Sequence, residues 1–159
     1  MSRLWAILLF IITSLPAAAQ QERPLAQAMQ DMREGNWAAA LIDSRADGQA
    51  ALDVILWHYL RASRGDPGQI MDFIARNPNW PGMPYLREKS EIAISESGDS
   101  RIVKAFFAGY RPQTGAGALA LARAYQAEGE AGAAEAEVVL AWRTLPLSAD
   151  ERRAFLADW

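Results

Sequence analysis

The residues with the clearest capacity for chemistry are the carboxylates, because one or two acidic side chains held in a cleft can cleave a glycosidic bond. Glu91 and Glu96 are the nearest candidates in the sequence. Glu91 stands beside Glu88 and Lys89 in a run that is typical of a solvated helix face, and Glu96 directly precedes a helix end. Neither place indicates an apolar pocket that would raise a carboxyl pKa. We therefore assign no catalytic residue and expect Glu91 to be exposed.

Other catalytic and metal-binding patterns are weaker. The one histidine, His58, lies between Trp57 and Tyr59 in an apolar segment without the serine and aspartate pattern of a triad. Stable metal sites need three or four ligands, and the chain has no cysteine and no histidine pair. The glycines at 115 and 117 follow a helix rather than a strand, so they predict a helix start and not a phosphate loop. We expect no metal and no cofactor.

The tryptophans are more informative, since the chain contains six of them. Core packing accounts for most, but large aromatic rings can also stack on sugars along the concave surface of a helical repeat. The candidates for contact with a glycan or a partner are Trp37, Trp57, Trp80 and Trp142. Of these, Trp80 stands among three prolines that cannot all be helical, which predicts a rigid connector with a buried tryptophan as its pin.

Helices must position these side chains. Proline at a first helical turn, capping residues and terminating glycines alternate with apolar stripes of helical spacing along the whole chain. The third expected helix runs from about Gln49 and closes at Gly65. The signals lie at or near Pro24, Asn36, Gln49, Asp66, Pro84, Asp99, Ala118, Ala134 and Ser148.

Glycines that end helices recur at 35, 65, 98 and 129, with intervals of 30, 33 and 31 residues. This is close to the roughly 34-residue period of tetratricopeptide-type hairpins. Small residues repeat in the same register around the first and last glycine, with Ala28 and Ala122 seven before, and Ala40 and Ala134 five after. We expect an all-α fold, a right-handed superhelix of helical hairpins with about eight or nine helices. An irregular helical bundle is the alternative.

The first residues predict export. Arg3 precedes an apolar run from Leu4 to Leu15, and Pro16 and three alanines follow, as in a secretory signal peptide. The run is short of the roughly 20 residues of a spanning helix, so we expect cleavage after Ala19 rather than a retained anchor. Residues 1–19 are then the signal peptide and 20–159 the helical domain. Without residues 1–19, which hold one basic and no acidic residue, the formal net charge moves from -3 to -4, which argues against a nucleic-acid partner.

One segment resembles a known family. The sequence from Phe73 through Trp80 to Pro81, then Leu86-Arg87 and Glu91, is similar to a signature in the N-terminal superhelical domain of soluble lytic murein transglycosylases. The resemblance covers roughly residues 25–159. Further similar segments follow in the same order at 105–107, 111–115, 121–122, 129, 141–143, 147–151 and 155–156.

The resemblance implies a curved support rather than an enzyme. In that family a separate lysozyme-like domain cleaves the glycan between N-acetylmuramic acid and N-acetylglucosamine and forms a 1,6-anhydro product. Its catalytic glutamate stands in a Glu-Ser motif with an aromatic soon after, followed by Gly-Leu-Met-Gln, and neither pattern occurs here. Glu96-Ser97 lacks that context, so no catalytic residue is carried over. We expect a chain truncated within its ninth helix.

The sequence thus predicts a non-catalytic periplasmic segment that supports peptidoglycan or a lysozyme-like catalytic domain. A periplasmic tetratricopeptide-like adaptor that binds proteins in its groove is one alternative, and an enzyme with an unrecognised site is another. No stable membrane anchor is expected. The ninth helix should leave Phe155, Leu156 and Trp159 uncovered, which predicts self-association through this helix.

Overall fold

The computed structural model describes residues 23–159, so the expected signal peptide and cleavage site lie outside the described residues. Every regular element in this range is helical, which confirms the predicted all-α fold. The right-handed superhelix stays a prediction. The elements are α1 Pro24–Glu34, α2 Trp37–Ser44, the 3-10 helix η1 Arg45–Asp47, α3 Gln49–Arg61, α4 Pro67–Arg76, α5 Met83–Glu96, α6 Ser100–Phe107, α7 Gly115–Ala127, α8 Ala131–Thr144 and α9 Ala149–Asp158.

Local capping chemistry sets several of these bounds. Asp66 and Ser148 each form a complete capping box, with Gln69 and Glu151 respectively, at the starts of α4 and α9. Thr114 accepts a hydrogen bond from the backbone of Gly117 and so begins α7. These contacts lie within three residues along the chain, which is why the helix starts could be predicted without knowledge of the fold.

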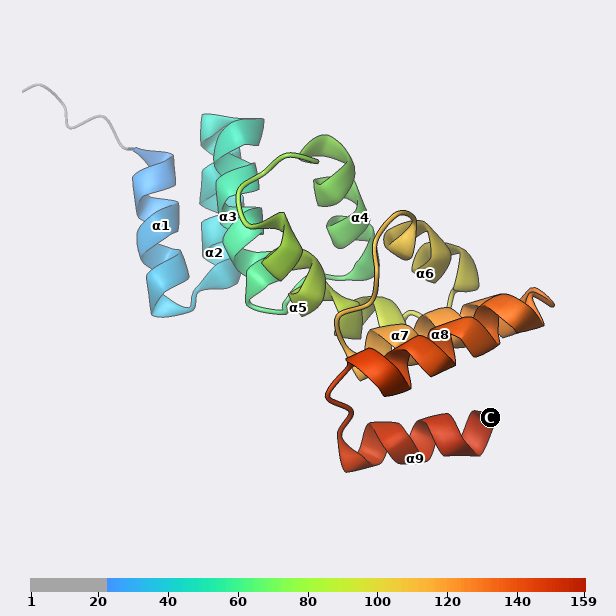
Figure 1. Ribbon diagram of the computed structural model, residues 1–159. Coiled ribbons are helices and arrows are strands. Elements are labelled where there is room, and N and C mark those ends of the chain that lie inside the picture. The colour runs from blue at the N-terminus through green and yellow to red at the C-terminus, as the bar shows by residue number, and fades with distance from the viewer. Residues whose placement is uncertain (1–22) are drawn as a thin grey trace, which may run out of the picture.

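Helices α1–α3 stand side by side at one end of the molecule, and α7–α9 form a second group at the other end (Figure 1). Helices α4, α5 and α6 lie between them (Figure 1). The largest apolar core lies in this middle region, where α3–α7 contribute side chains such as Leu60, Phe73, Leu86, Phe106 and Leu121. The core therefore runs through the middle of the chain and joins the two end groups.

The predicted small-residue register is present in two hairpins. Ala28 and Ala40 are buried where α1 packs closely along α2, and Ala122 and Ala134 are buried where α7 packs along α8. A methyl group at these positions lets the two helix backbones approach. By contrast, α3 with α4 and α5 with α6 share few contacts, and α5 packs instead on α3 and α7. The hairpins at the two ends of the chain therefore follow the predicted repeat, whereas the helices in the middle do not pair closely with their neighbours in sequence.

The prediction that Gly65 ends α3 is wrong. Helix α3 ends at Arg61, and Ser63 adopts the left-handed conformation, with a φ of 56°. The Ser63 hydroxyl donates to the Lys89 carbonyl oxygen at 3.2 Å, so a contact with α5 holds this turn. Gly65 is needed for another reason, because a Cβ atom there would collide with the side chain of Leu60. The 30-residue interval that ends at Gly65 was therefore not a repeat of the same cap.

The connector between α4 and α5 is not held by a buried Trp80, as was predicted. Trp80 is only half-buried, and its ring meets the edge of Phe73 with centroids 5.7 Å apart. The tie to another helix comes from Trp57 of α3, whose indole N–H donates to the Pro81 carbonyl oxygen at 3.0 Å. Trp80 packs the connector onto the core, and Trp57 joins it to α3.

Helix α9 is better covered than predicted. Phe155 is buried, with 1% exposure, among Ala118, Leu119 and Ala141 of α7 and α8, so the expectation that it is uncovered is wrong. Leu156 is 70% exposed, so part of the expected apolar face is present. No helix within residues 23–159 is long and apolar enough to cross a membrane.

We predict that Ala28→Leu destabilises the protein by about 1–3 kcal/mol, because three added carbon atoms must enter a closed contact between α1 and α2. Ala26→Leu is the matched control, since Ala26 is exposed on the same helix. It should change the free energy of unfolding by less than about 0.5 kcal/mol. Urea denaturation measures both values, and equal effects would show that the α1–α2 contact is not closely packed.

Candidate functional site

The structure brings two of the four candidate tryptophans to the C-terminal half of α3. Trp57 lies in that helix, and Trp37 of α2 meets the edge of Tyr59 with centroids 5.6 Å apart. Trp80 is near this region only through the connector, because the neighbouring Pro81 accepts the Trp57 bond. Trp142 lies apart on α8, exposed over Phe155 with ring centroids 6.5 Å apart. The four residues therefore do not form one aromatic row.

A cluster of two aromatic and two basic side chains lies between α3 and α5. The Arg61 guanidinium lies 4.3 Å from the centre of the Trp57 ring and 4.9 Å from that of Tyr85. The Lys89 ammonium lies 5.1 Å from the same Tyr85 ring. We call these four residues, Trp57, Arg61, Tyr85 and Lys89, the cation–aromatic cluster. Each of these contacts is within the range of a cation–π interaction.

The cluster is partly exposed to solvent and contains one N–H group without a hydrogen-bond acceptor in the described part of the chain. Tyr85 is 43% exposed. The Nε atom of Arg61 is buried and donates to no residue in the described part of the chain. A buried N–H group without a partner costs free energy, so such a group often indicates a ligand or a bound water molecule. Arg64 makes a separate contact of this kind, 5.7 Å from the centre of the Trp37 ring.

Our reading of the sequence missed three of these four residues. The signal is present, because Trp57 and Arg61 on α3, and Tyr85 and Lys89 on α5, have the same aromatic-to-base spacing of four. Residues four apart lie on one face of a helix, so each pair could be predicted as a local contact. The meeting of the two pairs could not, because it depends on how α3 packs against α5.

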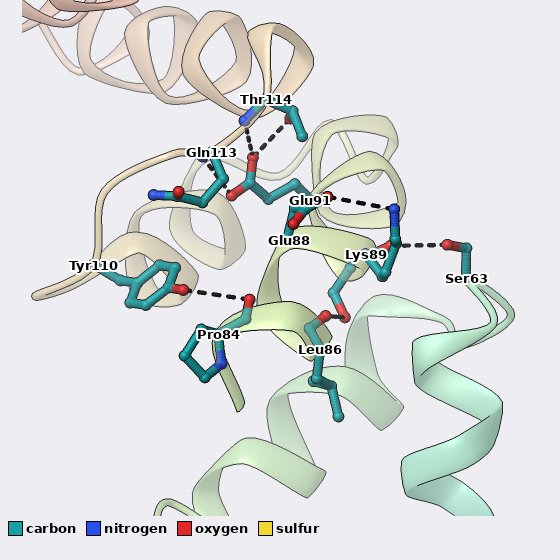
Figure 2. Close-up of polar contacts among 10 residues, drawn as sticks. Ser63, Pro84, Leu86, Glu88, Lys89, Glu91, Tyr110, Gln113 and Thr114 are labelled. Atoms are coloured by element: carbon teal, nitrogen blue, oxygen red, sulfur yellow. Dashed lines mark hydrogen bonds and ion pairs between the residues drawn. The ribbon is translucent and has the colours of Figure 1, made fainter. Parts of the chain in front are cut away.

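Glu91 is the other polar group of note, and the prediction that it is exposed is wrong. Its exposure is 0%. One carboxylate oxygen accepts the backbone N–H of Gln113 at 2.8 Å, and the other accepts the Thr114 N–H at 2.8 Å and the Thr114 hydroxyl at 2.6 Å. Figure 2 shows the carboxylate of α5 pointing into the segment that precedes α7. We call this set of bonds the Glu91 latch.

The repeat register explains this burial. Glu91 lies seven residues before Gly98, which is the inward position that Ala28 and Ala122 occupy before their own glycines. A glutamate is too large for a close hairpin crossing, and its carboxylate instead bonds to the residues that precede α7. Gly117 makes room for it, because a Cβ there would collide with the carboxylate. The prediction that Glu91 is exposed relied on its charged neighbours in the sequence and did not use this register.

Burial raises the pKa of Glu91 above its ordinary value, although the bonds from Thr114 and Gln113 act in the opposite direction. A carboxyl group with a raised pKa is a candidate general acid only where a substrate can reach it. Glu91 has no exposed surface and is engaged by three donors, so its geometry suits a positioning role. Glu96 is exposed at the end of α5, away from any described cleft.

His58 has a packing role in the described structure. Its ring meets the edge of Trp57 with centroids 4.7 Å apart. Burial and the neighbouring Arg61 charge lower the pKa of His58, which favours the neutral imidazole at neutral pH. Within residues 23–159, no group of three or more histidine, aspartate or glutamate side chains is arranged to hold a metal ion.

Searches of protein families, curated proteins and solved structures found no match to this chain. The functional interpretation therefore depends on the residues and their geometry.

We predict that Gly117→Ala destabilises the protein by about 1–3 kcal/mol, because the added methyl group must displace the Glu91 carboxylate or the ring of Phe107, 3.0 Å away. Gly132→Ala is the matched control on the exposed first turn of α8, where a Cβ meets nothing within 4 Å. It should stabilise by about 0.4–1 kcal/mol. Thermal or urea denaturation distinguishes the two, and a stabilised Gly117→Ala variant would contradict the latch geometry.

We also predict a pH dependence from Glu91. Its folded-state pKa is raised, so the native state binds this proton more tightly than the unfolded chain does. Stability from this group is therefore greatest below the unfolded pKa and falls as pH rises through the folded pKa. The free energy of unfolding of the wild type, minus that of Glu91→Gln, should decrease as pH rises above about 4.3. Urea denaturation over a pH series tests this, and a difference that grows with pH would contradict it.

Proposed function

We propose that this chain is a non-catalytic periplasmic segment that binds peptidoglycan and supports a lysozyme-like catalytic domain. The observation that supports binding is the cation–aromatic cluster, in which two basic groups, Arg61 and Lys89, lie close to the exposed Tyr85 ring. The resemblance around Trp80 supports the choice of peptidoglycan. The predicted signal peptide supports the periplasmic location.

The chemistry of the cluster suits a polymer of sugars and acidic peptides. A sugar ring presents a face of C–H groups that packs on an aromatic ring such as Tyr85. Peptide stems carry carboxylates, which the guanidinium of Arg61 and the ammonium of Lys89 can bind. Because both kinds of group lie within one small surface, a glycan strand with its peptide can contact both at once.

We assign no catalytic residue, because neither of the two acidic candidates lies in a place that suits catalysis. Glu91 is enclosed within the latch, and Glu96 lies at an exposed helix end. Cleavage of the glycan would then belong to the lysozyme-like domain that the family resemblance implies. The segment would hold the polymer and orient it toward that domain.

We predict that the purified chain sediments with peptidoglycan sacculi and that Tyr85→Ala or Lys89→Gln weakens this binding about two- to tenfold. These factors correspond to contacts of about 0.5–1.5 kcal/mol. Added salt should weaken binding further because the basic groups are partly exposed. Arg101→Gln, at a side chain 88% exposed on α6, is the control and should leave binding unchanged.

Three outcomes would contradict this proposal or its binding surface. Wild-type protein that stays in the supernatant would remove peptidoglycan as the ligand and favour the protein-binding adaptor. Release of anhydro-muropeptides, detected by mass spectrometry, would show that the chain is itself an enzyme. A loss of binding caused by Trp142→Ala but not by Tyr85→Ala would move the binding surface to α8.

A further inference from the structure

A second candidate site, with both polar and apolar side chains, lies on a different side of α3 from the cation–aromatic cluster. A cleft of about 180 Å³ lies between α2, η1, α3 and α4. This is smaller than the roughly 300–1,000 Å³ of pockets that enclose drug-sized ligands, so it suits one side chain or a similarly small group. The lining residues are Leu41, Arg45, Leu52, Leu56, Gln69, Asp72 and Arg76.

The apolar part of the cleft comes from three leucines. Leu56 is buried, with 8% exposure, and Leu41 and Leu52 are half-buried. These side chains belong to the edge of the main core, so the surface they offer is held in place by packing. An aliphatic group placed on them loses contact with water, which is favourable.

One arginine of the cleft is oriented by a buried carboxylate. Asp53 is nearly buried and accepts Arg76 Nη1 at 2.5 Å, Gln49 Nε2 at 2.9 Å and Asn77 Nδ2 at 3.2 Å. The Arg76 side chain is nevertheless 40% exposed. A guanidinium carries five N–H donors, so the bond to Asp53 leaves donors for a second acceptor. Asp53 thus fixes Arg76 in place at the cleft.

The other polar groups of the cleft have unused capacity. Within residues 23–159, the side chains of Arg45 and Asp72 form no hydrogen bond and no ion pair. Gln69 uses its Oε1 atom in the capping box of α4, which leaves its amide N–H groups free to donate. The cleft therefore combines positive donors, one carboxylate acceptor and an aliphatic floor.

We propose that this cleft binds an aliphatic residue that carries a free α-carboxylate, either as an amino acid or as the last residue of a peptide. Arg45 and Arg76 bind the carboxylate, the three leucines bind the aliphatic side chain, and Asp72 accepts from the α-ammonium or from the peptide N–H. The cleft thus offers groups of both signs to a ligand that carries both charges. This site is separate from the cation–aromatic cluster and does not depend on the proposed function.

The test is titration of the isotope-labelled protein with leucine, followed by nuclear magnetic resonance. Leucine should cause saturable shifts in residues of the cleft, whereas leucinamide, which lacks the carboxylate, should not. Alanyl-leucine that binds more tightly than leucine assigns the site to a peptide end, and the reverse assigns it to the free amino acid. Equal shifts with leucine and leucinamide, or no saturable shift with any of them at millimolar concentration, would overturn the proposal.

Two variants test the assigned roles, and each is checked for helical content by circular dichroism. Arg45→Gln should weaken leucine binding about tenfold or more, as expected when a charged hydrogen-bond partner is removed. Arg33→Gln, at an exposed arginine of α1 outside the cleft, is the control and should bind as the wild type does. Unchanged binding by Arg45→Gln would overturn the carboxylate assignment.

Asp72→Asn tests the opposite end of the ligand. It should weaken binding of leucine, whose ammonium contacts the carboxylate, more than binding of 4-methylpentanoate, which has neither an ammonium nor an amide N–H. An equal loss for both ligands would overturn this role of Asp72. Because Asp72 and Arg45 are exposed and outside the core, neither substitution removes a contact on which folding depends.

Discussion

The burial of one carboxylate is the constraint on which the middle of the structure depends. An ionised carboxylate transferred from water into a protein interior costs several kcal/mol unless hydrogen bonds compensate for it. Glu91 obtains three such bonds, all from the two residues that precede α7. Thr114 has two roles in this arrangement, because its hydroxyl donates to Glu91 and accepts from the backbone of Gly117. The start of α7 is therefore fixed to the same atoms that satisfy the buried charge.

The position of α5 also determines where its side chains on the face opposite Glu91 lie. Tyr85 and Lys89 stand on this helix, six and two residues before Glu91, so their place relative to α3 depends on where the latch holds the helix. Two further bonds help to hold α5 and its connector in place. The Trp57 indole N–H donates to the Pro81 carbonyl oxygen. The Ser63 hydroxyl donates to the Lys89 carbonyl oxygen (Figure 2). Helix α5 is thus held from α3 and from α7. The cation–aromatic cluster forms where these contacts bring two helices together.

The parts of the fold that could be predicted are those whose causes are local. The capping boxes at Asp66 and Ser148 and the left-handed caps at Gly35 and Gly129 depend on residues a few positions away. Glu91 could not be placed by the same reasoning, because its charged neighbours favoured a surface position and its partners lie more than 20 residues later. Only the repeat register carried the right information, since it put Glu91 where other repeats have a buried alanine.

Departures from the repeat also explain where the candidate sites occur. Alanine at the inward position lets α1 close on α2 and α7 close on α8, and no room remains between the paired helices. In the middle of the chain, the positions seven residues before Gly65 and Gly98 hold His58 and Glu91, although Gly65 itself lies beyond the end of α3. The helices of these two pairs share few contacts. That separation allows α3 to meet α5 and leaves a cleft between α2, α3 and α4. Sequences often depart from a local structural rule where function requires it. In this chain the two departures flank the surfaces that carry unused donors, so the middle repeats, rather than the regular ends, are where a ligand should be sought.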